Sequence, residues 1–127
     1  MEKKRILFVE DEPALQKTLH DYLVAEGFEV FLASNGEEGI HMVKSKKPDL
    51  VLLDIILPKK DGYEVIREIK ADPETKKIPV ILLTNLGSLN DVEKAVQLGA
   101  STYLIKSEYT LEEVLGKVKE TLGVKEQ

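Results

Sequence analysis

Short hydrophobic runs alternate along the chain with longer segments in which apolar residues recur at helical spacing. Aliphatic residues dominate the short runs, which is typical of buried strands. We predict five strands, at residues 5–10, 28–33, 50–54, 79–84 and 102–105. The longer segments predict five helices, over residues 13–26, 35–46, 62–72, 89–98 and 111–122.

The expected helix ends carry recognisable signals. Pro13 stands in a first turn, where proline is tolerated, and Gly27 and Gly99 follow the last residues of their helices. The segments 88–91 and 110–113 have the spacing of capping boxes, with Asp in place of Glu in the first.

Strands that alternate one by one with helices predict an α/β fold, a doubly wound five-stranded parallel sheet with helices on both faces. The strands are apolar at successive positions, as expected when both sides of a sheet are covered. With 127 residues and no visible linker or repeat, we expect a single domain over 1–127, with its core at about 4–123.

Polar residues stand at the carboxyl ends of the predicted strands or directly after them, where open α/β sheets place their sites. These residues are Glu10, Asp11, Asp54, Thr84 and Lys106. Asp54 ends an aliphatic run, and burying an unpaired carboxylate costs several kcal/mol. We therefore expect Asp54 either to emerge at the strand end or to have a partner there.

The amino-acid composition excludes several classes of function. The chain has no cysteine, which excludes disulfides, thiolate metal sites and cysteine nucleophiles. Its net charge of −5 argues against direct contact with nucleic acid or anionic membranes. Because it has neither a signal peptide nor an apolar run near the ~20 residues of a membrane span, we expect a cytoplasmic protein.

Several carboxylates in one crevice repel each other by about 4 kcal/mol per pair at 4 Å and an effective dielectric near 20. A divalent cation relieves this repulsion, and all-oxygen ligands indicate Mg²⁺, or Mn²⁺ in its place. Lys106 can pair with Asp54 and then with a phosphoryl oxygen, to which the Thr84 hydroxyl also donates. This combination is typical of an aspartyl-phosphate acceptor.

Together these residues resemble the receiver domain of two-component response regulators, such as the single-domain chemotaxis regulator. The resemblance covers about residues 4–123 and implies a flavodoxin-like strand order 2-1-3-4-5. Its motifs are Ile6-Leu7-Phe8-Val9-Glu10-Asp11-Glu12-Pro13, Asp54-Ile55-Ile56-Leu57-Pro58 with Asp61-Gly62, Leu82-Leu83-Thr84 and Tyr103-Leu104-Ile105-Lys106.

The resemblance implies that Asp54 is the phosphoacceptor and also a ligand of Mg²⁺. Asp11 would bind the metal directly, Glu10 through water, and Ile56 through its backbone carbonyl. The phosphodonor would be a histidine kinase or a histidine phosphotransfer protein. No enzyme activity of its own is expected beyond self-phosphorylation from small donors and slow autodephosphorylation.

The resemblance also implies how phosphorylation changes the conformation of the domain. Lys106, the Thr84 hydroxyl and the backbone of Asn85 would bind the phosphoryl group. Thr84 would act as a switch together with Tyr103, altering the face of the fourth helix, fifth strand and fifth helix for a downstream protein. A homodimer through this face is compatible with the sequence, but residues 101–102 lack the acidic pair that many dimerising relatives carry.

Four positions depart from the usual pattern. Ser107 replaces a proline that commonly follows a cis peptide, so we predict a trans bond after Lys106. Asn85 is bulkier than usual and would narrow access to the phosphoryl group. Ile56 and Leu86 are apolar and cannot orient an attacking water, which predicts slow autodephosphorylation.

Three other functions compete with that of a receiver. A phosphohydrolase of the haloacid dehalogenase type needs an acid at the position of Ile56. A flavodoxin-like nucleotide or flavin module needs a phosphate loop where residues 10–12 are acidic. A degenerate receiver that serves only as a protein-interaction module would lack some of the acceptor residues, which are all present here: Asp11, Asp54, Thr84 and Lys106. The sequence leaves open whether the chain is a stand-alone receiver or part of a longer regulator, and which kinase and target it serves.

Overall fold

The hydrophobic runs form one parallel sheet in the order β2-β1-β3-β4-β5 in the computed structural model, which describes residues 3–124. The strands are β1 (Arg5–Val9), β2 (Glu29–Ala33), β3 (Leu50–Leu53), β4 (Val80–Thr84) and β5 (Thr102–Ile105). The helices are α1 (Pro13–Ala25), α2 (Gly36–Lys46), α3 (Gly62–Ala71), α4 (Leu89–Leu98) and α5 (Leu111–Leu122), with a short 3₁₀ helix at Lys106–Glu108. Apart from this 3₁₀ turn, every element was predicted.

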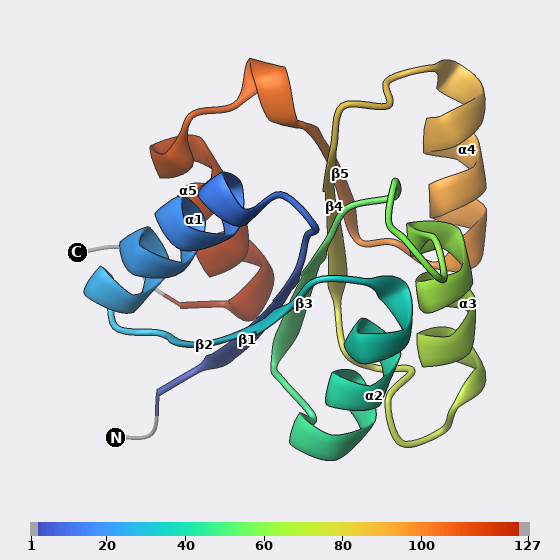
Figure 1. The fold of residues 1–127 in the computed structure, drawn as a ribbon, viewed down its shortest axis with the longest axis horizontal. Coiled ribbons are helices and arrows are strands. Elements are labelled where there is room, and N and C mark those ends of the chain that lie inside the picture. Colours follow the sequence, from blue (N-terminus) through green and yellow to red (C-terminus); the bar gives the residue numbers. More distant parts are fainter. Residues whose placement is uncertain (1–2, 125–127) are drawn as a thin grey trace.

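The sheet separates two layers of helices, with α1 and α5 on one face and α2, α3 and α4 on the other (Figure 1). Successive strand residues enter opposite cores, so Leu7 packs with Ile66 on the α3 side and Phe8 packs with Leu19 on the α1 side. The predicted strand order and helices on both faces are confirmed.

Both strands that deliver acids end one residue before them, not at them as the sequence analysis expected. The parallel pairing of β1 with β3 stops at Val9 and Leu53, so Glu10 and Asp54 lie just beyond the last paired positions. Their backbones still donate hydrogen bonds, to Ala33 and Val9 respectively. The two carboxylates are therefore fixed to the sheet edge while their side chains turn into the site.

The predicted caps are largely confirmed. Ser88 accepts a hydrogen bond from the Asp91 N–H, and Thr110 forms a full capping box with Glu113. A further capping box joins Asp61 and Glu64 at the start of α3. Glu12 occupies the position before α1, but its side chain makes no capping hydrogen bond.

Tyr63 ties α3 to α4. Its buried ring carries a hydroxyl that donates to Asp91 Oδ1 at 2.7 Å, and the Lys94 ammonium lies 4.1 Å from the ring centroid. We expect Tyr63→Phe to lower the free energy of unfolding by about 0.5–1.5 kcal/mol, because Asp91 loses a donor to its charged oxygen and water replaces it only in part. Urea unfolding measures this. Tyr22→Phe, whose hydroxyl lies on α1, is the control and should change stability by under about 0.5 kcal/mol.

Candidate phosphoacceptor site

The carboxyl ends of β1, β3 and β5 bring together the charged residues that the sequence analysis selected. Asp54 does not emerge into solvent, since it is 5% exposed, and Glu10 is 1% exposed. The partner expected for Asp54 is present, because Lys106 Nζ donates to Asp54 Oδ2 at 2.7 Å. The Lys106 side chain is itself 15% exposed.

Lys106 also forms an ion pair that the sequence pattern did not predict. Its Nζ lies 2.6 Å from Glu10 Oε1. Oε1 is buried, so the Lys106 ammonium is the charged group that compensates it. The other oxygen, Oε2, accepts the Glu12 N–H at 3.2 Å.

These contacts shift the protonation equilibria of the site. Burial raises the pKa of the Glu10 carboxyl; the Lys106 ammonium opposes this effect, and the charge of Asp54 adds to it. Burial alone would lower the pKa of Lys106, but the hydrogen bond to Asp54 and the neighbouring Glu10 outweigh it and raise that pKa. Lys106 is therefore a permanent positive charge at neutral pH.

The acids also lie close enough to share a metal ion. One carboxylate oxygen each from Glu10, Asp11 and Asp54 falls within 4.8 Å of the others, and Asp11 is exposed. Three carboxylates around one Lys leave a net negative charge. An oxygen-only donor set with excess negative charge fits a hard divalent cation such as Mg²⁺.

The residues expected to act as a switch form a separate chain of contacts. Thr84 is fully buried, and its Oγ1 accepts the Leu86 N–H at 3.4 Å. The Tyr103 hydroxyl donates to the Leu86 carbonyl at 2.5 Å. Among residues 3–124, neither Thr84 nor Asn85 hydrogen-bonds to Asp54. The loop after β4 thus connects Thr84 with Tyr103.

The unusual positions follow the carboxyl ends of β3, β4 and β5. Ile56 is 60% exposed, and its N–H donates to Asp54 Oδ1 at 3.3 Å. Asn85 and Ser107 are exposed. The peptide between Lys106 and Ser107 is trans, as predicted, since the described chain has no cis bond. Lys106 still reaches Asp54 with this geometry.

Gln16 supports the site although nothing in its sequence neighbourhood singled it out. Its side-chain amide donates to the backbone carbonyls of Glu10 and Ala33 and to Ser34 Oγ. It thereby joins the ends of β1 and β2 to α1. Residues this far apart in sequence meet only in the folded chain, so local patterning carries no signal for them.

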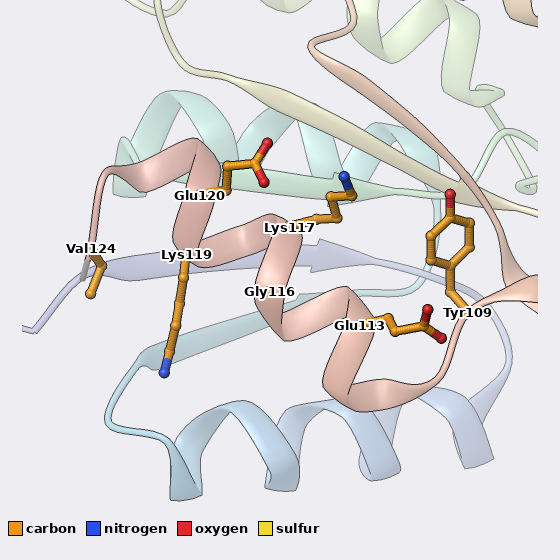
Figure 2. Close-up of a pocket in the computed structure, with 7 residues that line it drawn as sticks. All are labelled: Tyr109, Glu113, Gly116, Lys117, Lys119, Glu120 and Val124. Carbon is orange, nitrogen blue, oxygen red and sulfur yellow. The ribbon is translucent and has the colours of Figure 1, made fainter. Parts of the chain in front are cut away.

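A hollow of about 350 Å³ lies along the length of α5, from Tyr109 to Val124 (Figure 2). Its lining is mixed in charge and comprises Tyr109, Glu113, Gly116, Lys117, Lys119, Glu120 and Val124. In Figure 2, Lys119 points toward α1, where its Nζ lies 3.7 Å from Glu26, while Lys117 points to the opposite side of α5. The charged side chains diverge, so the hollow does not form a second convergent site.

A family model of the response regulator receiver domain matches residues 6–119. The chain therefore belongs to the receiver domains of two-component response regulators, as its motifs predicted. Such domains interact with histidine kinases or phosphotransfer proteins. None of the helices described for residues 3–124 has the length and hydrophobicity to cross a membrane.

Curated relatives include a protein of similar length and longer ones. Sporulation initiation phosphotransferase F of Bacillus subtilis is 34% identical over 125 residues, which cover 98% of each chain. The probable transcriptional regulator ycf27 of Guillardia theta is 40% identical over 104 residues, or 82% of this chain and 40% of that protein. The DNA-binding dual master transcriptional regulator RpaA of Synechocystis is 36% identical over 118 residues, or 93% of this chain and 48% of its own length. The chain thus spans less than half the length of these two regulators.

Solved receiver domains have the same fold. A CheY-like receiver domain from Methanospirillum hungatei superposes with a TM-score of 0.88 at 31% identity, covering 96% of this chain and 95% of that one. The receiver domain of a sensor histidine kinase from Pseudomonas aeruginosa has a TM-score of 0.87 at 30% identity, covering 96% and 99%. That structure holds a magnesium ion coordinated in its active-site cleft.

Proposed function

We propose that Asp54 accepts a phosphoryl group from a phosphohistidine of a kinase or phosphotransfer protein. One Asp54 oxygen forms a bond to phosphorus while the phosphorus–nitrogen bond of the donor breaks and its electron pair returns to the imidazole. Lys106 and the Thr84 hydroxyl balance the charge on the transferred group, together with the backbone of Asn85. The observation that carries this proposal is the Lys106 bridge from Asp54 to Glu10 beside Asp11.

Mg²⁺, or Mn²⁺ in its place, would be held by Asp11, Asp54 and the Ile56 carbonyl, with Glu10 acting through water. When bound, it neutralises negative charge around the acceptor. The cation would offset the mutual repulsion of these carboxylates. Burial already disfavours the charged form of Glu10, since it raises the pKa of that carboxyl. Apart from self-phosphorylation by small donors and slow loss of the phosphoryl group, the domain has no enzymatic role in this proposal.

The output is proposed to pass through Thr84 and Tyr103 to the face formed by α4, β5 and α5, which a downstream protein would bind. A cytoplasmic location stays a prediction. So does the absence of direct nucleic-acid contact, because relatives whose names describe transcriptional regulators extend well beyond this domain.

Beryllofluoride with Mg²⁺ tests the proposal, since it mimics an acyl phosphate on a carboxylate. We expect large shifts of the amide signals near Asp54, Thr84 and Tyr103 in nuclear magnetic resonance spectra. A flavin or nucleotide module, or a degenerate receiver, would leave these signals in place. The phosphohydrolase alternative also lacks its second acid, because an exposed Ile56 stands there. Unmoved signals at saturating beryllofluoride would reject the proposed function.

The phosphoryl group is expected to be long-lived. Ile56 and Leu86 offer no polar side-chain atom that could orient an attacking water. The paired substitutions Ile56→Asn and Leu86→Glu should speed phosphate loss by about tenfold or more. The decay of labelled protein after donor removal measures this rate. Leu89→Glu, at an exposed residue of α4, is the control, and an unchanged decay in the paired variant would contradict the expectation.

A further inference from the structure

Gln16 lies near the start of α1, and its half-buried side chain reaches the ends of two strands. Its amide donates to the Glu10 carbonyl, to the Ala33 carbonyl at 3.3 Å and to Ser34 Oγ at 3.1 Å. Glu10 follows β1, and Ala33 is the last residue of β2. Because a side-chain amide has only two N–H groups, these three oxygens engage its donors fully.

The same residue holds the loop between β1 and α1 at two points. Its backbone N–H donates to the Glu12 carbonyl at 3.0 Å, while its side chain donates to the Glu10 carbonyl. The Glu10 N–H is fixed as well, since it donates to the Ala33 carbonyl at 2.9 Å. Both backbone polar groups of Glu10 therefore have partners, although the pairing of β1 with β3 has already stopped at Val9.

The Glu10 carbonyl belongs to the peptide unit that leads into Asp11. Because a peptide unit is planar, a hydrogen bond that fixes its oxygen also fixes the direction in which the next Cα atom lies. Asp11 is exposed, and one of its carboxylate oxygens lies within 4.8 Å of those of Glu10 and Asp54. An exposed carboxylate has few neighbours packed against it, so its position depends mainly on its backbone.

Gln16 also connects this loop to the two loops that follow β2 and β3. Ser34, which accepts one of its N–H groups, comes directly after β2. Two residues further on, the Gly36 N–H donates to the Pro58 carbonyl at 3.2 Å, in the loop after Asp54. The loops that follow β1, β2 and β3 are therefore joined by hydrogen bonds, and Gln16 makes the first of these connections.

We propose that Gln16 is a positioning residue for the divalent cation, because it holds the Glu10–Asp11 peptide in the orientation that presents the Asp11 carboxylate. The inference rests on the proposed function, in which Asp11 binds the metal directly. Mg²⁺ demands nearly ideal octahedral geometry, so a small displacement of one ligand weakens binding. Groups that orient a metal ligand without touching the metal typically change the affinity by about 10- to 100-fold. Gln16 acts through a main-chain carbonyl rather than through the ligand's side chain.

Gln16→Met tests the assignment, because methionine keeps a long unbranched side chain but has no N–H donor. We expect the affinity for Mg²⁺, measured by calorimetric titration of the full chain, to fall about tenfold. In the metal-free protein, the backbone amide signals of residues 10–12 and 33–35 should move, while those of α4 stay in place. An unchanged affinity in this variant would overturn the proposal.

Two controls separate positioning from a general loosening of the fold. Lys17→Met makes a similar change one residue along α1, at an exposed lysine that pairs with Asp21. Tyr63→Phe removes a hydrogen bond between α3 and α4 and so lowers stability without touching the loop after β1. Both variants should bind Mg²⁺ within about twofold of the wild type. A loss in Tyr63→Phe as large as that in Gln16→Met would refute the proposal, since stability alone would then set the affinity.

Self-phosphorylation by acetyl phosphate at varied Mg²⁺ supplies a second readout. The Mg²⁺ concentration that gives half of the maximal rate should rise about tenfold in Gln16→Met. The maximal rate should stay within about twofold of the wild type, because Asp54 and Lys106 keep their contact. A lower maximal rate with an unchanged Mg²⁺ requirement would refute the positioning role and leave the proposed function standing. A wild-type chain that binds no Mg²⁺ at all refutes both.

Discussion

Phosphoryl transfer to this chain is expected to vanish when Asp54 is replaced by asparagine. An amide oxygen is a far weaker nucleophile than a carboxylate, and the side chain keeps its size. Lys106 retains Glu10 as a charged partner, so the fold should survive Asp54→Asn. Incubation with acetyl phosphate or a histidine kinase, followed by intact mass spectrometry, should show labelling reduced by at least about hundredfold.

Asp49 provides the matched control for this experiment. It lies just before β3, at the opposite end of the strand from Asp54, and accepts the Arg5 N–H at 2.8 Å. Asp49→Asn should be labelled like the wild type, because an amide oxygen can still accept that hydrogen bond. If Asp54→Asn were labelled at the wild-type level, the acceptor would have to be another carboxylate, and the proposed function would need revision.

A methyl group at Gly36 is expected to cause the largest loss of stability. An added Cβ would lie 1.9 Å from the Lys60 carbonyl oxygen, which is fixed backbone rather than a flexible side chain. The Gly36 N–H also donates to the Pro58 carbonyl at 3.2 Å, so the loop after Asp54 packs directly on the start of α2. Gly36→Ala should lower the free energy of unfolding by about 2–3 kcal/mol in urea titrations, since the loop must move.

Gly116 distinguishes this clash from the general effect of replacing a helical glycine. It lies within α5 and lines the open hollow there, so Gly116→Ala should stabilise the chain by about 0.5–1 kcal/mol through the unfolded state and helix propensity. Displaced amide signals over residues 57–61 are expected in Gly36→Ala alone. A Gly36→Ala variant as stable as the wild type would show that the loop is not held by this packing.

Much of the fold followed from patterns that act locally. The apolar run at 50–53 and the capping residue Thr110 each specify an element through burial or through hydrogen bonds to near neighbours. Several boundaries moved by one residue, such as the start of β2 at Glu29 and the end of α1 at Ala25, and among them β1 and β3 end one residue early, before the acids. At the ends of β1 and β3, strand pairing stops because the charged side chain turns out of the sheet toward the lysine that pairs with it.

The sequence predicted which residues form the site better than it predicted the contacts between them. Asp54 was expected to emerge or to have a partner, and it stays buried with Lys106. The expectation that Glu10 acts only through water did not include the Lys106 ion pair. Charge and residue type are visible in sequence, whereas the reach of two long side chains across four strand ends is not.

The sequence by itself determined the α/β class, the family and the set of acids, lysine and hydroxyl at the strand ends, because periodicity, capping and motif order are written in neighbouring residues. Only the tertiary structure decided which of these groups touch. Parallel strands from distant parts of the chain meet at one edge, and the pairing of Lys106 with both Glu10 and Asp54 depends on that arrangement. The close packing of Gly36 on Lys60 and the tether of Tyr63 to Asp91 have the same origin, since each joins elements that only folding brings within contact distance.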